Sequence, residues 1–280
     1  MDYKIGIYEK AMPSGQSWEA MLTQAKAAGF DYMEVSVDET DDRLARLDFT
    51  PAQRAGVRRA MENAGLSIRS MCLSGHRKFP LGSRDAETRR RSLEIMDKAL
   101  ELSCELGVRI IQLAGYDVYY EEGGADTRAY FAENLQKCAE MAAKCGVVLG
   151  FETMETEFMD TVGKAMEYVR MVDSPYLQVY PDLGNLTNAA VKYGHDVLDD
   201  IRTGRGHLVA MHLKETVPGV YRDMMFGEGH VAFAPAIAQA LEMGVRMFVT
   251  ECWYAPRLDI AQVRRFADAK FIEAEAIENA

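Results

Sequence analysis

Four residues of types that commonly bind metal ions stand at the ends of short apolar segments in the second half of the sequence. They are Glu152, Asp182, His212 and Glu251, separated by 30, 30 and 39 residues. Three carboxylates in one enclosed space would repel one another and raise their pKa values unless a cation balanced them. Two Glu, one Asp and one His form a mixed oxygen and nitrogen ligand set, which suits Mn²⁺, Zn²⁺, Co²⁺ or Fe²⁺ better than Ca²⁺ or Mg²⁺. The pattern predicts a divalent metal site, provided that the fold brings these residues together.

The segments that carry these residues belong to a repeating pattern of helix, glycine and strand. An amphipathic helix ends at a Gly, which readily takes the positive φ found just after a helix, and a short apolar strand follows. We expect eight strands, at Ile5–Tyr8, Tyr32–Val37, Ser67–Leu73, Arg109–Ala114, Val147–Glu152, Leu177–Asp182, Leu208–Leu213 and Met247–Glu251. Helical periodicity is expected at 18–25, 93–104, 131–145 and 162–169, with a helix starting at Pro51, shorter helices near 197–201 and 236–243, and a long last helix at about 258–277.

Apolar strands that alternate with helices predict a parallel sheet covered by helices. Eight such units in 280 residues predict a closed (β/α)₈ TIM barrel that forms one domain over residues 1–280. An open, doubly wound sheet is the alternative fold, but no expected strand is followed by a G-x-G-x-x-G or P-loop motif. In a parallel barrel the functional residues lie at the carboxyl ends of the strands, which is where the four candidate ligands stand.

Each candidate ligand also has a simpler interpretation when it is taken alone. A single acidic residue at a strand end is more often a helix cap or a solvated loop residue, and His212 could be a buried histidine without a function. Four such residues on successive strand ends favour the metal site. Glu34 ends the second strand beside the acidic run at 38–42, and we assign it no catalytic role.

Charge and cysteine content restrict the class of partner. The net charge is 32 − 43 = −11, with His neutral, and such an acidic surface repels nucleic-acid phosphate and anionic lipid. We therefore expect neither a nucleic-acid nor a membrane partner. Five cysteines without a C-x-x-C pair predict reduced thiols and a cytoplasmic protein. The first residues lack a signal-peptide pattern, and no apolar run reaches the roughly 20 residues that cross a bilayer.

Basic and amide side chains near the expected strand ends are candidates for binding a substrate. His76 and Arg77 follow the third strand, Lys214 and Arg222 follow the seventh, and Asn185 stands three residues after Asp182. In an acidic protein, basic residues at the functional face suggest an anionic substrate group, most simply a phosphate. The arginines could equally be solvated loop charges, and Asn185 could cap the next helix.

Several longer stretches match a known enzyme family. They are GIYEK at 6–10, VDETD at 37–41, RLARLD at 43–48, CLSGHR at 72–77, LAGYDVYY at 113–120, YPDLGNL at 180–186, HLKET at 212–216 and FGEG at 226–229. With these stretches the chain resembles the L-ribulose-5-phosphate 3-epimerases, also called L-xylulose-5-phosphate 3-epimerases, of bacterial ascorbate and pentose catabolism. These enzymes belong to the xylose-isomerase-like, metal-dependent sugar isomerases and epimerases.

The resemblance implies one divalent metal ion, expected to be Zn²⁺ or Mn²⁺, bound by the four candidate ligands. It also implies that Glu152 and Glu251 are the proton-transfer pair and that the protein is a homodimer. Two positions depart from the family pattern, because Glu155 and Ala232 stand where Asp is expected. Both lie near the expected mouth of the barrel, so they bear on substrate preference rather than on the reaction type.

The implied reaction interconverts L-ribulose 5-phosphate and L-xylulose 5-phosphate. It removes a proton from C3 and returns one to the other face through a cis-enediolate, with the metal as Lewis acid and a carboxylate on each face. Alternatives on the same barrel are a hexulose-6-phosphate isomerase, another ketose 3-epimerase, or an aldose–ketose isomerase that moves a proton between C1 and C2. A barrel that binds a ligand without chemistry is a further alternative, whereas the acidic charge disfavours a metal-dependent abasic-site nuclease.

Overall fold

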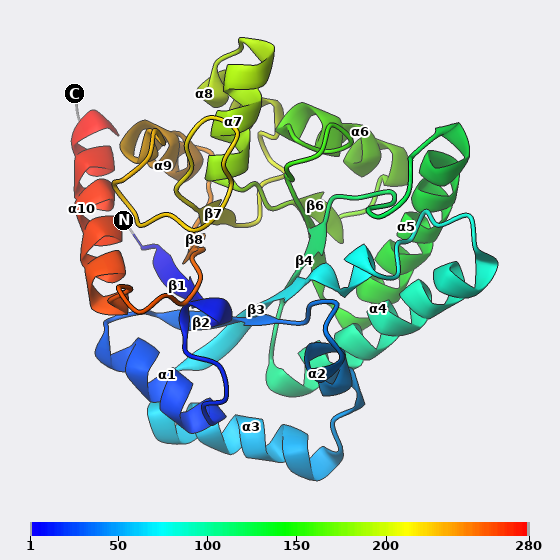
Figure 1. Cartoon of the computed structure of the whole chain (residues 1–280), viewed down its shortest axis with the longest axis horizontal. Helices are drawn as coiled ribbons and strands as arrows, with labels where there is room; N and C mark the ends of the chain where they lie inside the picture. The colour runs from blue at the N-terminus through cyan, green and yellow to red at the C-terminus, as the bar shows by residue number, and fades with distance from the viewer. Residues whose placement is uncertain (1, 279–280) are drawn as a thin grey trace.

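Eight parallel strands curl into a barrel with helices around the outside (Figure 1). We describe residues 2–278 from a computed structural model. The strands are β1 (Lys4–Tyr8), β2 (Tyr32–Ser36), β3 (Ser67–Leu73), β4 (Ile110–Ala114), β5 (Val148–Glu152), β6 (Leu177–Val179), β7 (Met211–Leu213) and β8 (Met247–Thr250). Strands β1 to β5 each pair in parallel with the next strand in sequence, β7 pairs with β8, and β8 pairs with β1. The structure therefore confirms the predicted (β/α)₈ TIM barrel.

The barrel closes between β6 and β7 through isolated bridges rather than a continuous ladder. Val179 bridges to Leu208, and Asp182 bridges to His212, whose backbone N–H donates to the carbonyl of Pro181 at 2.9 Å. The predicted strands Leu177–Asp182 and Leu208–Leu213 were therefore too long as regular strands. Pro181 has no N–H to donate to a ladder. The irregular pairing nevertheless brings Asp182 beside His212.

The helices alternate with the strands along the sequence, and they lie on the outer side of the barrel (Figure 1). The α-helices are α1 (Trp18–Ala27), α2 (Asp41–Leu44), α3 (Pro51–Ala64), α4 (Ala86–Leu106), α5 (Ala125–Cys145), α6 (Val162–Val172), α7 (Leu183–Tyr193), α8 (Val197–Thr203), α9 (Phe233–Glu242) and α10 (Ile260–Glu278). Short 3₁₀ helices are η1 (Glu9–Ala11), η2 (Ala45–Asp48) and η3 (Ser74–Arg77). The sequence analysis missed α7, although Leu183, Leu186 and Ala190 are buried at helical spacing along it. Helix α3 begins at Pro51 as predicted, and Thr50 and Gln53 form a capping box at its start.

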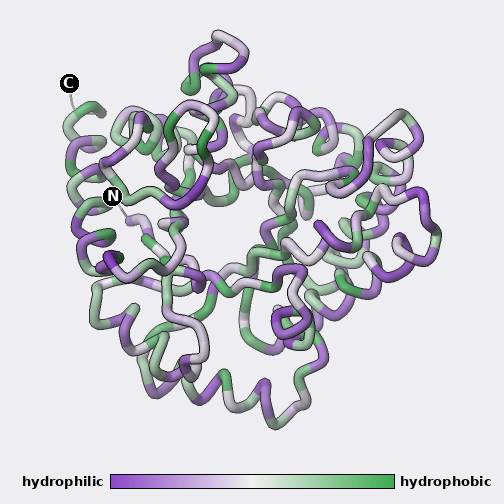
Figure 2. Tube along the Cα trace, viewed as in Figure 1, coloured by the Kyte–Doolittle hydropathy of each residue, from purple (hydrophilic) through white to green (hydrophobic). Residues whose placement is uncertain are grey.

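The larger hydrophobic core fills the space between the barrel and the helices. Ile5 and Ile7 of β1 and Met33 and Val35 of β2 belong to this outer core and are fully or almost fully buried. Figure 2 shows mainly hydrophobic strands and helices that alternate between hydrophobic and hydrophilic residues. No helix among residues 2–278 is long and apolar enough to span a lipid bilayer. The prediction of one domain over 1–280 stays a prediction, and residues 1 and 279–280 lie outside the described part.

The strand residues between the outer-core positions point into the barrel. A smaller cluster there includes the side chains of Tyr8, Tyr32, Cys72, Ile110, Tyr180, Ala210 and Val249. Two glycines give the tyrosine rings their space. A Cβ atom at Gly6 would lie 2.6 Å from ring atoms of Tyr32, and one at Gly150 would lie 2.9 Å from Cβ of Tyr180. Because side chains alternate along a strand, the residue two positions after such an inward residue also points inward, near the mouth.

We expect Gly6→Ala to lower the free energy of unfolding by about 1–3 kcal/mol, as overpacking in a well-packed interior does. The Tyr32 ring cannot move aside easily, since it is fully buried and its hydroxyl donates to the carbonyl of Phe248 at 3.0 Å. Gly56→Ala in α3 is the control, because nothing lies closer than 3.9 Å to the new Cβ and Ala favours a helix. Urea unfolding measures both variants. A Gly6→Ala protein as stable as the wild type would contradict this packing.

Candidate metal centre

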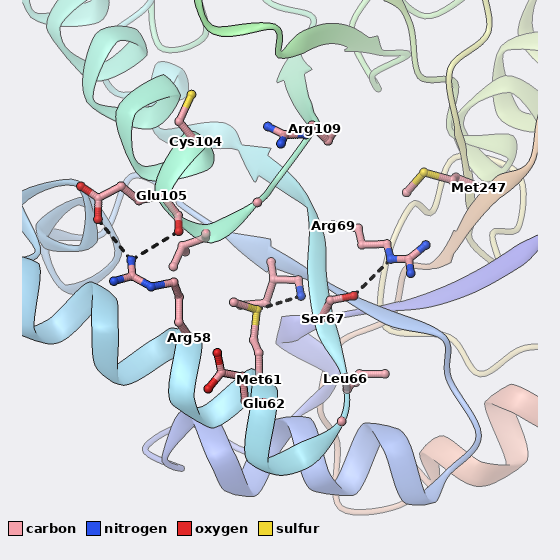
Figure 3. Close-up of a pocket in the computed structure, with 14 residues that line it drawn as sticks. Arg58, Met61, Glu62, Leu66, Ser67, Arg69, Cys104, Glu105, Arg109 and Met247 are labelled. Atoms are coloured by element: carbon pink, nitrogen blue, oxygen red, sulfur yellow. Dashed lines mark hydrogen bonds and ion pairs between the residues drawn. The ribbon is translucent and has the colours of Figure 1, made fainter.

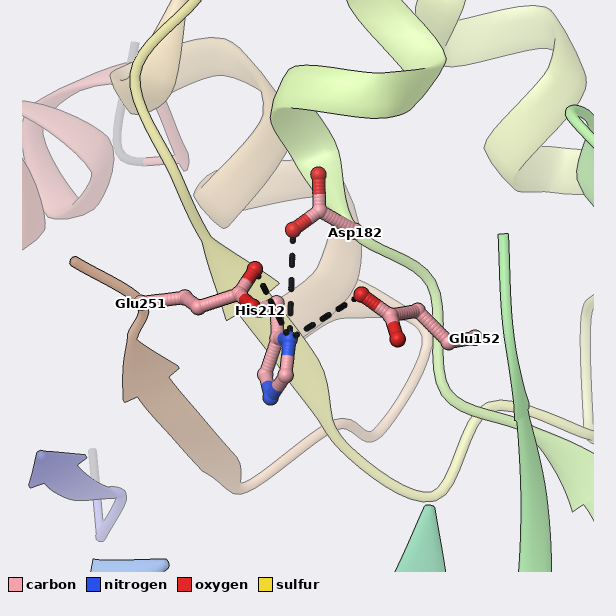
Figure 4. Close-up of side chains that lie close together, drawn as sticks. All are labelled: Glu152, Asp182, His212 and Glu251. Atoms are coloured by element: carbon pink, nitrogen blue, oxygen red, sulfur yellow. Dashed lines mark ion pairs between the residues drawn. The ribbon is translucent and has the colours of Figure 1, made fainter. Parts of the chain in front are cut away.

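The four predicted ligands lie together at the carboxyl end of the barrel (Figure 4). Glu152 ends β5, Asp182 follows β6, His212 lies in β7 and Glu251 follows β8. Each stands two residues after a residue that points into the barrel, so the strand alternation turns all four side chains inward. One ligand atom from each residue lies within 4.8 Å of the other three, and all four residues are buried.

The imidazole of His212 is at the centre of this group. Its Nδ1 lies 3.7 Å from Oε1 of Glu152, 3.8 Å from Oδ2 of Asp182 and 3.4 Å from Oε2 of Glu251. Glu152 and Glu251 approach from opposite sides in Figure 4, with Asp182 between them. The separations are too long for direct hydrogen bonds but suit several atoms arranged around one small cation.

Three buried polar atoms of the cluster lack a hydrogen-bond partner among the described residues, as expected of atoms that bind a metal ion. Asp182 Oδ2, His212 Nδ1 and Glu251 Oε2 are buried, and no described residue forms a hydrogen bond with any of them. Buried polar atoms are almost always paired, so three such atoms facing one point need an explanation. Lys214 supplies one positive charge, with its Nζ 3.1 Å from Asp182 Oδ2 and 3.4 Å from Glu251 Oε2. One ammonium does not balance three carboxylates, and the oxygen and nitrogen set can hold a divalent metal ion.

The pKa values of the three carboxyl groups move apart in this enclosed site. Burial raises the pKa of Glu152, and repulsion from Glu251 raises it further. Burial also raises the pKa of Asp182 well above its usual value, although Lys214 opposes the shift. Burial acts on Glu251 in the same direction, but the positive charges of Lys214 and His212 outweigh it and hold its pKa well below the usual value. Without a metal, Glu152 and Asp182 therefore hold their protons to a higher pH than free carboxyl groups do.

A residue that the sequence analysis set aside contacts the other nitrogen of His212. Glu34 is fully buried in β2, and its Oε1 lies 2.7 Å from Nε2 of His212. Glu34 was assigned no catalytic role because the acidic run at 38–42 follows it closely. Its position two residues after the inward-facing Tyr32 is the signal that could have placed it inside the barrel.

Asp182 belongs to the metal cluster and also caps a helix. Its Oδ1 accepts a hydrogen bond of 2.7 Å from the backbone N–H of Asn185 at the start of α7, while its Oδ2 faces His212. Asn185 does not cap the helix with its own side chain. Its Nδ2 donates to the carbonyl of Thr153 at 2.7 Å, and its buried Oδ1 has no hydrogen-bond partner among the described residues. That oxygen can accept a hydrogen bond from a ligand.

A pocket above the cluster contains most of the predicted substrate contacts. Its lining includes Arg77, Asn185, Lys214 and Arg222, together with Tyr8, Lys10, Cys72, Ser74, Glu152, Met154, Glu155, Tyr221, Glu251 and Trp253. His76 is the predicted contact that does not line this pocket. Its ring is buried, its Nε2 lies 3.1 Å from the carbonyl of Ser92, and burial lowers its pKa to about 4. A neutral imidazole directed at α4 is a structural group rather than a phosphate ligand.

The outer part of the pocket is held by contacts among charged and aromatic side chains. Tyr116 donates a hydrogen bond of 2.9 Å to Glu155, and the Arg77 guanidinium lies 4.7 Å from the ring centre of Tyr119. Arg222 lies 3.7 Å from Glu155. Glu155, which departs from the family pattern, therefore contacts the hydroxyl of Tyr116 and the guanidinium of Arg222. It lines the outer part of the pocket and is not one of the four clustered residues.

The glycine-rich segment at 226–229 has a structural explanation. The buried carboxylate of Glu215 accepts hydrogen bonds from the backbone N–H groups of Thr216, Gly227 and Val231 at 3.2, 2.8 and 3.2 Å. At Gly229 a Cβ atom would lie 2.2 Å from that carboxylate. The glycines thus allow the loop to fold tightly around Glu215, just after the segment that carries Arg222.

A larger hollow lies at the opposite, amino-terminal end of the strands (Figure 3). Its volume is about 840 Å³, and its lining includes Met61, Leu66 and Met247 with Arg58 paired to Glu105 at 3.3 Å. Among residues 2–278, no group of metal-ligating side chains of the kind found at the other end lines this hollow. In parallel barrels this end serves stability rather than chemistry.

Comparison with known proteins agrees with this geometry. A family model described as xylose isomerase-like TIM barrel matches residues 22–270. The L-ribulose-5-phosphate 3-epimerase UlaE of Escherichia fergusonii is 42% identical over 281 aligned positions, which cover 99% of this chain and 98% of that protein.

Solved structures share the fold at low sequence identity. A D-tagatose 3-epimerase-like protein superimposes with a TM-score of 0.79 at 15% identity, covering 98% of both chains. An L-ribulose 3-epimerase superimposes with a TM-score of 0.76 at 20% identity, covering 99% of this chain and 96% of that one. Taken together with the nearly full-length match to UlaE, these findings show that the chain belongs to the xylose isomerase-like TIM barrel family and groups there with the L-ribulose-5-phosphate 3-epimerases.

Proposed function

We propose that this protein is an isomerase that interconverts L-ribulose 5-phosphate and L-xylulose 5-phosphate by inverting C3. The observation that carries the proposal is the convergence of two strand-end glutamates, Glu152 and Glu251, on one buried centre. The 42% identity to UlaE over 99% of the chain supports the choice of substrate. The alternative, an isomerase or 3-epimerase of hexulose 6-phosphate or another ketose, uses the same centre and differs in the sugar.

Glu152 and Glu251 are proposed as the proton-transfer pair. They end strands on different sides of the barrel mouth and approach the same centre from opposite sides (Figure 4). A sugar carbon held between them presents one face to each carboxylate, so one glutamate removes the C3 proton and the other returns a proton from the opposite side. Their contrasting environments suit these roles, because burial raises the pKa of Glu152 while Lys214 and His212 hold the pKa of Glu251 low.

We propose one divalent ion, Zn²⁺ or Mn²⁺, held by Glu152, Asp182, His212 and Glu251. When bound, the ion supplies a Lewis acid that stabilises negative charge developing on substrate oxygens. Lys214, which contacts Asp182 and Glu251, adds a fixed positive charge beside the reacting carbon. The unpaired Oδ1 of Asn185 is placed to accept a hydrogen bond from a sugar hydroxyl.

Arg77 and Arg222 are proposed to bind the phosphate at the outer end of the pocket. Guanidinium groups match phosphate oxygens in charge and geometry. The space now left between the lining residues is about 50 Å³, well below the roughly 300–1,000 Å³ of small-molecule sites. We therefore expect the partly exposed Arg222 to leave Glu155 and turn toward the phosphate when a substrate enters.

The remaining assignments follow the resemblance and the composition. We propose a cytoplasmic homodimer that acts in carbohydrate metabolism, in a route such as ascorbate catabolism, with a sugar phosphate as its small-molecule partner. The net charge of −11 supports the expectation that neither nucleic acid nor membrane is a partner.

Incubation of the metal-loaded protein with L-ribulose 5-phosphate in D₂O should place deuterium at C3 and produce L-xylulose 5-phosphate, as followed by proton NMR. We expect Glu152→Gln and Glu251→Gln each to lower the rate of interconversion by about 10²–10⁴-fold, because an amide neither removes nor returns the proton. Each variant should still exchange the C3 proton of at most one of the two epimers for deuterium.

Glu157→Gln is the control, since its side chain is 77% exposed and pairs with Lys192 at the surface. Metal content is measured for every variant, so that loss of the ion is distinguished from loss of the proton carrier. Deuterium at C1 instead of C3 would identify an aldose–ketose isomerase, and binding without any exchange would identify a protein without this chemistry.

Metal binding should release protons and strengthen as the pH rises. The raised pKa values of Glu152 and Asp182 mean that the metal-free site holds protons where free carboxyl groups have lost them. A cation must displace these protons, so its apparent affinity falls as the solution becomes more acidic. Calorimetric titration of Zn²⁺ in buffers of different ionisation enthalpy measures the release. Affinity that is independent of pH, with no proton release, would contradict these assignments.

Arg222→Ala should raise KM for L-ribulose 5-phosphate by about 10–100-fold, the loss expected for one hydrogen bond to a charged group. The change for unphosphorylated L-ribulose should be much smaller, because that sugar lacks the anion. Arg205→Ala is the matched control, since Arg205 pairs with Glu242 at the surface. Equal effects of Arg222→Ala on both sugars would place the phosphate elsewhere.

A further inference from the structure

Glu34 is a carboxylate enclosed inside the barrel beneath the metal cluster. It is fully buried, and its neighbours on the inner barrel surface include Tyr32, Cys72 and Tyr180. Moving an ionised carboxylate from water into such a place is costly, and an apolar side chain of the same size often gives equal or better stability. The position therefore calls for a role other than packing.

Within residues 2–278, the hydrogen bonds to this carboxylate come from side chains inside the barrel. Its Oε2 accepts from the hydroxyl of Ser70 at 2.7 Å and from the hydroxyl of Tyr180 at 2.9 Å. Its Oε1 lies 2.7 Å from Nε2 of His212. Two hydroxyl donors hold one oxygen, and the other oxygen is directed at the imidazole. Ser70 and Tyr180 thus fix the direction from which Glu34 meets His212.

This contact determines which imidazole nitrogen carries a proton. An ionised carboxylate only accepts hydrogen bonds, so Nε2 of His212 must donate. Nδ1 is then the nitrogen that can exchange its proton for a cation, and it is the nitrogen that faces Glu152, Asp182 and Glu251 at 3.4–3.8 Å. Its lack of a hydrogen-bond partner among the described residues agrees with that role.

We propose that Glu34 is a positioning residue that orients His212 as a metal ligand by holding the proton on Nε2 and directing Nδ1 into the cluster. A carboxylate bound to the outer nitrogen of a ligating histidine fixes the ring and makes the ligating nitrogen more basic, and loss of such a partner typically weakens metal binding 10–100-fold. The inference rests on the metal centre proposed above, and it adds a residue that does not contact the ion.

The test measures the affinity of the metal-free full-length protein for Zn²⁺ by competition with a chromophoric chelator. Glu34→Gln keeps the shape of the side chain and removes its charge, and Glu34→Leu also removes the acceptor. We expect the dissociation constant to rise by about 10-fold for Glu34→Gln and by up to about 100-fold for Glu34→Leu. Asp117→Asn is the matched control, because Asp117 is another buried carboxylate that accepts from a hydroxyl, that of Thr127 at 2.6 Å.

A second measurement reads the proton on His212 directly. In ¹⁵N-histidine-labelled wild type, Nε2 of His212 should carry a proton with and without Zn²⁺, and a His212→Gln variant assigns its signals. Zn²⁺ should shift the Nδ1 resonance. If Glu34→Leu does not fold, Glu34→Gln and these spectra decide the question.

Two results would overturn the inference. One is Zn²⁺ binding by both Glu34 variants within about threefold of the wild type, and the other is a neutral His212 whose proton resides on Nδ1. Failure of the metal centre itself gives a different result, since the wild type would then not bind Zn²⁺ at all. In that case spectra of the labelled metal-free protein, recorded at a pH where His212 is neutral, still report whether Glu34 holds the proton on Nε2.

Discussion

The repulsion among carboxylates at the barrel mouth is the constraint on which the site depends. Glu152, Asp182 and Glu251 all face Nδ1 of His212 within 3.8 Å, in a place that water hardly reaches. Only Lys214 supplies a nearby permanent positive charge among the described residues that contact them. A divalent ion held by these residues would relieve this repulsion, and it would supply the Lewis acid that a carboxylate base needs to remove a proton from a sugar carbon. The same ion would therefore relieve the electrostatic repulsion in the protein and supply the Lewis acid that the reaction requires.

The barrel supplies this arrangement through strand alternation and two small residues. Gly6 leaves room for the ring of Tyr32 and Gly150 for the Cβ of Tyr180, and these two tyrosines belong to the cluster inside the barrel. Two residues after an inward-facing residue of this layer, the next inward position of a strand carries a carboxylate or an imidazole. The packed apolar layer therefore lies directly below the polar site. The hydroxyl of Tyr180 reaches from this layer to Glu34 and donates a hydrogen bond to it.

The ligand set could be predicted because each member ends a recognisable strand. Parallel strands in a barrel place their carboxyl ends at one face, so spacing by one βα unit was sufficient to group them. The role of Asp182 as a helix cap was weighed against metal binding, yet the structure combines the two, with one oxygen for the α7 backbone and the other for the cluster.

Residues whose role depends on packing inside the barrel could not be predicted in the same way. Glu34 was overlooked because its sequence neighbours resemble an acidic loop, and its partner His212 is 178 residues away. His76 was predicted as a substrate contact from its basic neighbours, but its ring turns to the carbonyl of Ser92. Side-chain direction in the short helix after β3 has no periodic signal in the sequence.

The most direct test of the account is a crystal structure of the Zn²⁺-loaded protein with anomalous data collected on either side of the zinc absorption edge. The account predicts a single strong peak at the carboxyl end of the barrel, bonded to Nδ1 of His212 and to oxygens of Glu152, Asp182 and Glu251. A peak at another place, or a metal bound through Nε2 of His212, would contradict it.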